Sequence, residues 1–200
     1  MKKIQIAVLG SSKAICSKKA YDMAVKVGEE LANNNCTVIT GGGMGIMEAA
    51  LKGAKKKSGL TVAIIPWESM KIVNDYADVV IATGIGWSRN SINLNSCDGA
   101  IVIEGGAGTL NEATYAYIQN KPIVALESSG GTAKELANRY LDKRKTQKIY
   151  GESTPESAVK KILKLAIEYD KATKLSKLDQ ELMEMEKNAN QYLNKNKRKK

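Results

Sequence analysis

The sequence predicts an α/β protein, with a doubly wound, Rossmann-like and mainly parallel sheet of about seven strands and helices on both faces. Two observations support this class. Short apolar runs rich in valine and isoleucine alternate with longer amphipathic stretches along the chain, which is typical of strand–helix–strand units. The strand candidates are also apolar at consecutive positions, as expected for parallel strands that are covered on each face.

Seven short runs rich in β-branched residues are expected to be strands. In chain order they are 3–10, 37–41, 61–65, 78–83, 99–104, 122–126 and a short one at 146–151. Helices are expected in the amphipathic stretches between and after them, at about 17–33, 45–57, 89–96, 109–119, 132–141 and 155–170. In sheets of this class ligands bind beyond the carboxyl ends of the strands, so function is expected in the loops that follow the strands.

The end of the chain differs from the rest. Residues 1–172 are expected to form a Rossmann-like nucleotide-binding domain, and residues 173–200 a helical, basic C-terminal tail. The tail contains no glycine or proline, and from Leu175 to Tyr192 its apolar residues recur in a three–four rhythm. Such a helix could lie on its own domain, fray into solvent or pack on a partner subunit.

The residue types exclude several kinds of site. The chain contains no histidine, which removes nucleophilic pairs built on histidine and the commonest metal ligand, so no metal site is expected. Cys16, Cys36 and Cys97 fit neither a zinc nor a disulfide spacing and are expected to be buried, reduced thiols. Acid–base chemistry must therefore rest on carboxylates, lysines, tyrosines or a cysteine.

The net charge of +10 does not predict a nucleic-acid partner. Half of it comes from five residues at the C-terminus, which are Lys195, Lys197, Arg198, Lys199 and Lys200. No apolar run reaches the roughly 18 residues of a membrane span. The N-terminal apolar run stops at Gly10 without a cleavage site, so a cytoplasmic location and no membrane partner are expected.

Loops rich in glycine or serine follow four of the strand candidates. They are "GSS" at 10–12, "GGGMG" at 41–45, "TGIGWSRN" at 83–90 and "EGGAGTLNE" at 104–112. Glycine lets the backbone approach a ligand, and amides at a helix N-terminus point toward an anion. The first loop lacks the dinucleotide form G-x-G-x-x-G, and no G-K-[ST] triplet of a P-loop occurs.

The stretch "TLNE" at 109–112 has two interpretations. It fits the S/T-x-x-E capping box, in which Thr109 and Glu112 would satisfy helix amides without any ligand. Alternatively, the glycines before it bind a phosphate and Glu112 places a carboxylate beside that phosphate. The spacing alone favours the cap.

Taken together, the loops resemble the Lonely Guy branch of the SLOG Rossmann-like superfamily, whose members are often labelled lysine decarboxylase-like. Its hallmark is P-G-G-x-G-T-x-x-E preceded by an arginine, and here "EGGAGTLNE" follows Arg89. The segments "TGGGMGIMEAALKGA" (40–54) and "NDYADVVIATGIGWSRNSIN" (74–93) are more similar still to a prokaryotic subgroup close to the molybdenum-cofactor carrier proteins. Glu104 stands where the hallmark has proline.

This resemblance implies a protein that binds a phosphorylated, nucleotide-like ligand and hydrolyses the N-glycosidic bond of nucleoside 5′-monophosphates. Alternatively, it implies a non-catalytic carrier of molybdenum cofactor, a pterin or another phosphorylated ligand. Arg89 and Glu112 would be the catalytic residues. The residues expected to bind phosphate or nucleotide are Gly10, Ser11, Ser12, Gly42, Gly43, Gly45, Asn90, Gly105, Gly106, Gly108 and Thr109.

The resemblance further implies a homodimer or higher homo-oligomer and no required cofactor, although a nucleotide or molybdenum cofactor could be the ligand. Trp67 and Trp87 follow strand candidates, and either could stack on a base or pterin ring or be buried at the rim of the fold. Lysine decarboxylase activity is not supported, because no lysine can be nominated for a Schiff-base pocket.

Overall fold

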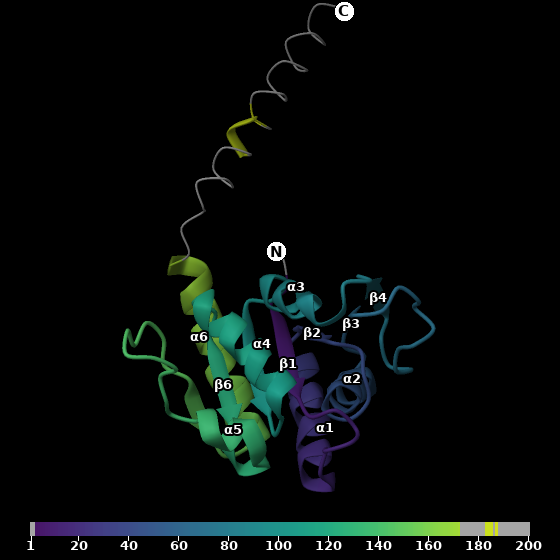
Figure 1. The fold of residues 1–200 in the computed structure, drawn as a ribbon, viewed down its shortest axis with the longest axis horizontal. Helices are drawn as coiled ribbons and strands as arrows, with labels where there is room; N and C mark the ends of the chain where they lie inside the picture. Colours follow the sequence, from purple (N-terminus) through teal and green to yellow (C-terminus); the bar gives the residue numbers. More distant parts are fainter. Residues whose placement is uncertain (1–2, 173–182, 186, 188–200) are drawn as a thin grey trace, which may run out of the picture. The chain divides into compact units, whose positions relative to one another are not determined.

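A single parallel sheet organises the computed structural model, which describes residues 3–172, 183–185 and 187. Within these residues the sheet has seven strands in the order β4-β3-β2-β1-β5-β6-β7, and every pair is parallel (Figure 1). The strands are β1 (Gln5–Gly10), β2 (Thr37–Thr40), β3 (Thr61–Ile65), β4 (Val79–Ala82), β5 (Gly99–Ile103), β6 (Ile123–Leu126) and β7 (Tyr150–Glu152). The predicted doubly wound α/β class is confirmed.

Helices cover both faces of the sheet (Figure 1). They are α1 (Lys18–Asn33), α2 (Ile46–Lys56), α3 (Arg89–Asn95), α4 (Ala107–Ile118), α5 (Gly131–Leu136) and α6 (Pro155–Ala172), with short 3-10 turns η1 (Gly86–Ser88) and η2 (Glu127–Ser129). Successive strand side chains point to opposite faces. In β1, Ile6 and Val8 pack with α1, α2 and α6, whereas Ala7 and Leu9 pack with α3, α4 and α5. Each large aliphatic side chain buried in this way stabilises the fold by about 1.5–3 kcal/mol.

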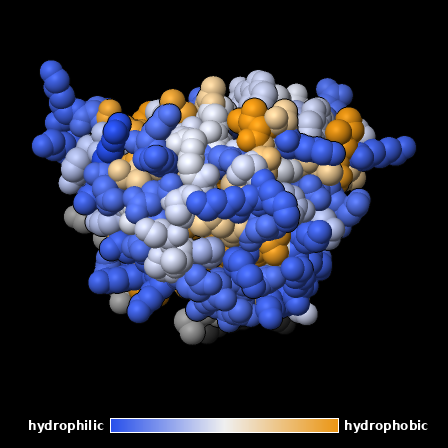
Figure 2. All heavy atoms as spheres, turned by 90° about the horizontal axis from the view of Figure 1, so that it is seen from below, coloured by the Kyte–Doolittle hydropathy of each residue, from blue (hydrophilic) through white to orange (hydrophobic). Residues whose placement is uncertain are grey.

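The order of the strands places a switch point between β1 and β5. The chain builds β1 to β4 outward on one side, then returns to add β5, β6 and β7 on the other. The loops after β1 and β5 therefore diverge and leave a crevice at the carboxyl edge of the sheet. This edge is at the lower side of Figure 1, and Figure 2 looks onto it, where pale and orange surface lies among hydrophilic side chains.

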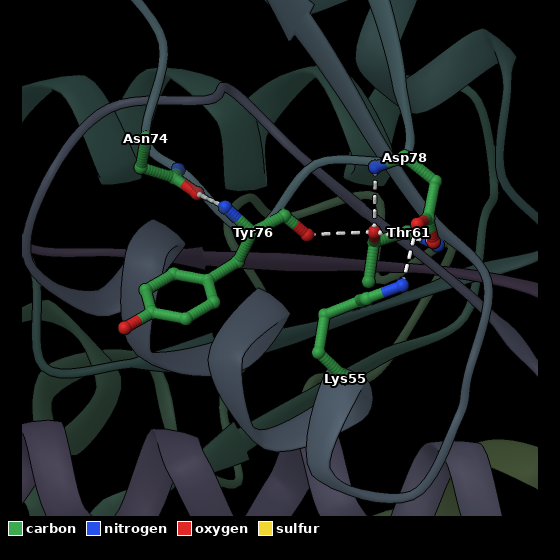
Figure 3. A network of polar contacts seen from close by, with 5 residues as sticks. All are labelled: Lys55, Thr61, Asn74, Tyr76 and Asp78. Atoms are coloured by element: carbon green, nitrogen blue, oxygen red, sulfur yellow. Dashed lines mark hydrogen bonds and ion pairs between the residues drawn. The ribbon is translucent and has the colours of Figure 1, made fainter.

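The connection between β3 and β4 is long and is anchored at its end by a polar network (Figure 3). The carboxylate of Asp78 accepts hydrogen bonds from the amide of Thr61 at 3.0 Å and forms an ion pair with Lys55 of α2. The Thr61 hydroxyl lies 2.7 Å from the carbonyl of Tyr76, to which it donates. This network holds the start of β3 against the end of the connection.

The largest differences between the predicted and the observed boundaries are in α5 and β7. The helix expected to run to residue 141 ends at Leu136, because Ala137 is extended and Asn138 adopts a positive φ of +62°. The last strand was expected at 146–151 and covers Tyr150–Glu152, where Tyr150 pairs with Val124 of β6.

The chain forms two compact units, Met1–Tyr169 and Asp170–Lys200. The first unit holds all seven strands. The tail expected at 173–200, with its apolar rhythm, lies outside the described residues except for 183–185 and 187, which are helical.

Candidate functional site

A cavity of about 600 Å³ opens at the carboxyl edge of the sheet, within the range typical of small-molecule sites. Residues from the loops after five strands, and from the starts of the helices that follow, line it; they fall within 10–15, 41–47, 66–67, 86–90 and 106–112. Ten of the residues expected to act on or bind the ligand are in the lining: Gly10, Ser11, Ser12, Gly43, Arg89, Asn90, Gly106, Gly108, Thr109 and Glu112. The structure thus brings together residues from both halves of the chain.

A buried ion pair, between Arg89 and Glu112, forms part of the cavity wall. Arg89 begins α3 and Glu112 lies in α4, and the guanidinium Nη1 is 2.8 Å from Oε1 of the carboxylate. The residues are only 5% and 8% exposed. The same nitrogen donates to the side chain of Asn90, while Arg89 Nε has no hydrogen-bond partner among the described residues. A methyl group on Gly41 would overlap the guanidinium, so the glycine makes room for the pair.

The environment of Glu112 shifts the pKa of its carboxyl group. Burial raises the pKa of the Glu112 carboxyl above its ordinary value, and the positive charge of Arg89 opposes that rise. A carboxylate with a raised pKa accepts a proton near neutral pH more readily than an exposed glutamate does. The pair is therefore suited to general base chemistry at the cavity wall.

The capping-box interpretation of residues 109–112 is wrong. Helix α4 begins at Ala107 with Gly106 as its N-cap, and glycine has no side chain that could accept a hydrogen bond from a helix amide. Thr109 lies inside the first turn, and Glu112 pairs with Arg89 instead of with a helix amide. The helix starts two residues early because Gly105 takes a φ of +102°, which turns the chain directly into α4.

The backbone at Glu104 has a conformation that a proline at this position could not adopt. Its φ is +50°, whereas proline is held near −65°. Its amide donates to Ser129 Oγ at 2.7 Å, a hydrogen bond that proline cannot make. Its carboxylate accepts hydrogen bonds from Ser11 Oγ at 2.6 Å and from the amide of Ser17 at 3.1 Å. The side chain thereby ties the end of β5 to the loop after β1.

Three glycines of the expected set, Gly42, Gly45 and Gly105, lie outside the cavity lining. All have positive φ, at +74°, +89° and +102°. A methyl group on Gly45 would lie 2.6 Å from the carbonyl oxygen of Ser11, so this glycine lets the start of α2 approach the loop after β1. Asn74 holds the same region by donating to the carbonyl of Gly42 at 3.0 Å. These glycines shape the loops.

Sequence reasoning did not single out the apolar wall and the lysine of the cavity. Met44, Met47, Ile15 and Lys13 line it and carried no signal beyond their place in the loops after strands. Trp67 and Trp87, flagged by their position after strands, also line it. They are 39% and 75% exposed, so burial at the rim does not describe them.

Among the described residues, no group of histidine, cysteine, aspartate and glutamate side chains could hold a metal ion. Cys36 and Cys97 are buried and free as expected, and burial raises the pKa of each thiol to about 11. Cys16 is also free but only half-buried, so the expectation of burial is wrong for it. No helix within the part of the chain that the structure describes is both long and apolar enough to cross a bilayer.

The fold and the cavity are those of a Rossmann-like protein with a ligand-type crevice at its switch point. Residues 3–159 match the sequence model of the SLOG cluster4 family, and the chain belongs to this family.

Two solved structures share the fold over most of this chain. The molybdenum cofactor binding protein from Rippkaea orientalis is 32% identical with a TM-score of 0.73, covering 82% of this chain and 98% of that one. The molybdenum cofactor carrier protein from Chlamydomonas reinhardtii is 27% identical with a TM-score of 0.72, covering 83% and 99%.

A third relative is the cytokinin riboside 5′-monophosphate phosphoribohydrolase of Mycobacterium tuberculosis. It is 32% identical over 118 residues, which are 54% of this chain and 63% of that protein. These relatives confirm the resemblance to the Lonely Guy branch near the molybdenum-cofactor carriers.

Proposed function

We propose that the cavity binds a phosphorylated small molecule with a planar ring, and that Arg89 and Glu112 hydrolyse the N-glycosidic bond when this ligand is a nucleoside 5′-monophosphate. The observation that carries the proposal is the buried ion pair in the wall of a cavity that also includes the start of α4. Buried, paired ionisable groups in a cavity of this size are typical of catalytic sites.

The phosphate is proposed to bind at the start of α4. The first amides of a helix have no partner inside it, and no described side chain caps α4. Residues 106–109 line the cavity, so these amides can donate to phosphate oxygens. Lys13 lines the same cavity and supplies a positive charge. The unpartnered Nε of Arg89 adds a further buried donor to this region.

The ring is proposed to bind against the apolar wall. Trp67, Trp87 and Met44 present exposed side chains to the cavity. A methyl group on Gly108 would lie only 3.6 Å from the Trp87 ring, so this tryptophan stands next to the proposed phosphate site. Stacking between aromatic faces suits a purine base or a pterin equally.

In the hydrolytic step the bond between ribose C1′ and the base nitrogen breaks, and its electron pair leaves with the base. Water supplies the oxygen that bonds to C1′. Glu112 stabilises the positive charge on the ribose and accepts the proton of the water, while the departing base takes up a proton from solvent. Arg89 orients the Glu112 carboxylate and offsets the cost of its burial.

A second candidate is a carrier that binds molybdenum cofactor or a related pterin without turnover. Two observations favour it. The two molybdenum-cofactor proteins are matched over 98–99% of their length, and the hydrolase over 63%. Glu104 also replaces the hallmark proline and reshapes the turn before α4.

Incubation of the purified protein with AMP distinguishes these functions. The hydrolase predicts release of adenine and a slowing of about 10²–10⁴-fold in Glu112→Gln, the usual worth of general acid–base catalysis. Glu48→Gln is the matched control, because this substitution makes the same charge change in the first turn of α2, outside this cavity. Its rate should equal that of the wild type.

A rise in melting temperature with AMP or a pterin phosphate but no adenine would favour the carrier and overturn the hydrolase. The absence of any shift with either ligand would overturn the binding proposal itself. The homodimer or higher oligomer that the resemblance implies stays part of the proposal, and light scattering of the same preparations measures it.

A further inference from the structure

The carboxylate of Glu104 is an anionic group of the protein itself, bound by hydrogen-bond donors of the segment that follows β1. It accepts hydrogen bonds from Ser11 Oγ and from the backbone amide of Ser17, the N-cap residue of α1. A hydroxyl and an amide at a helix N-terminus are the donors that a ligand phosphate would use. Glu104 therefore already takes two of the donors in the segment that follows β1.

This carboxylate lies directly behind the cavity wall. Ser11 lines the cavity and is bonded to Glu104, and Gly106, two residues after Glu104, lines it as well. The Ser11 hydroxyl also accepts the amide of Gly105 at 2.8 Å, so the carboxylate, the hydroxyl and the turn before α4 form one connected unit. A phosphate at residues 106–109 would lie next to this unit.

The charges around the proposed phosphate site nearly cancel. Lys13 contributes one positive charge, and Arg89 is offset by Glu112. Among the described residues Glu104 takes part in no ion pair of its own. The field of Glu104 is felt at Cys16, which directly follows the cavity-lining residues 10–15, since burial first and then this carboxylate raise the pKa of the Cys16 thiol.

We propose that Glu104 is a specificity-determining residue that opposes dianionic phosphate, so that the site discriminates in favour of ligands whose phosphate carries a single negative charge. This inference rests on the proposed function, because it concerns the same phosphate site. Like charges at close range repel more strongly in a partly buried site than in bulk water. The repulsion on a dianion is twice that on a monoanion at the same position.

A purely structural role and a role in opposing the phosphate predict opposite changes in ligand affinity for the charge-neutral variant Glu104→Gln. If Glu104 only ties β5 to the loop after β1, Glu104→Gln loses one of its acceptors and weakens ligand binding. If its charge opposes the phosphate, Glu104→Gln strengthens binding although a hydrogen bond is lost. The sign of the change in affinity separates the two roles.

The experiment measures the dissociation constants of AMP, a dianion at pH 8, and of its monoanionic 5′-methyl ester at low salt. Glu104→Gln should bind AMP about tenfold more tightly and the methyl ester about threefold more tightly, with both gains shrinking as salt screens the charge. Glu104→Gly is a second variant, because glycine tolerates the φ of +50° and also removes the charge.

Two controls separate charge from contact. Glu127→Gln makes the same change at the same edge of the sheet, after β6 and outside the cavity lining, and should leave both affinities unchanged. Ser11→Ala removes a hydrogen bond but keeps the charge of Glu104, and should not tighten the binding of either ligand.

Each outcome decides one proposal or both. If the wild type binds AMP and neither Glu104 variant binds it more tightly, the inference is overturned and the proposed function stands. If only the Glu104 variants bind AMP, the inference is supported and binding of dianionic monophosphates by the natural chain is overturned. If none of the proteins binds either probe, both proposals fail.

Discussion

Arg89 and Glu112 show how much depends on individual side chains at this site. They belong to different helices, α3 and α4, and each is buried where an unpaired charge would be strongly disfavoured. Their ion pair reconciles burial with charge, and Gly41 makes it possible by lacking a side chain. Removing one partner leaves the other charge buried and uncompensated.

The raised pKa of Glu112 predicts a pH dependence of stability. Because the native state binds this proton more tightly, the carboxyl stabilises the fold most below its ordinary pKa of 4.5, and the stabilisation is lost as pH rises through the native pKa. The unfolding free energy of the wild type minus that of Glu112→Gln should therefore decrease as pH rises above 4.5. Urea titrations across this range measure it. A difference that grows with pH would mean that Arg89 outweighs burial.

At the scale of elements, α1 and α2 approach each other through glycine. Methyl groups on Gly28 of α1 and on Gly53 of α2 would overlap the backbone of the facing helix, at Ala50 and Val25 respectively. The two helices cover the same face of the sheet, and the side chains of Ile46 and Leu51 of α2 are fully buried in the core there. This close contact sets the position of the loops at the starts of both helices, which flank the cavity.

Gly53→Ala tests this packing. In an isolated helix the substitution would stabilise by about 1 kcal/mol. Here the overlap with Val25 should reverse the sign and lower the unfolding free energy by about 1–3 kcal/mol. Gly108→Ala is the control in α4, since its new methyl group would make only an ordinary contact at 3.6 Å with Trp87. Thermal and urea unfolding measure both variants. If Gly53→Ala were as stable as the wild type, α1 and α2 could separate slightly at little cost in free energy.

At the scale of the whole molecule, the topology assembles the candidate site. Parallel strands direct all their carboxyl ends to one edge, so loops from residue 10 to residue 112 line a single cavity. The sheet and the cavity both belong to the unit Met1–Tyr169. The division of the chain into a domain at 1–172 and a tail at 173–200 is consistent with this placement and stays a proposal.

Truncation after Ala172 tests that division. The shortened chain keeps every described strand and all the residues of the cavity, so it should melt cooperatively within a few degrees of the full chain. It should also retain the shift that AMP induces. Calorimetry measures the melting, and light scattering of both forms shows whether the tail alters the number of subunits. A truncated protein that does not fold would assign the tail a part in the core.

Much of the fold could be predicted because its signals are local. The β-branched runs and the amphipathic stretches between them predicted six helices and seven strands, with errors mainly after Leu136, where a positive φ at Asn138 ends α5. The site was only partly predictable. "TLNE" has the letters of a capping box, and nothing in those four residues reveals that Glu112 faces Arg89.

By itself the sequence determined the parallel α/β class, the glycine-rich loops and the edge of the sheet at which they gather, because periodicity and turn chemistry act between near neighbours. Only the tertiary structure decided that Glu112 pairs with Arg89, and that Glu104 bonds to Ser11, 93 residues away. Those contacts depend on β5 returning beside β1, a long-range consequence of the topology that no local pattern encodes.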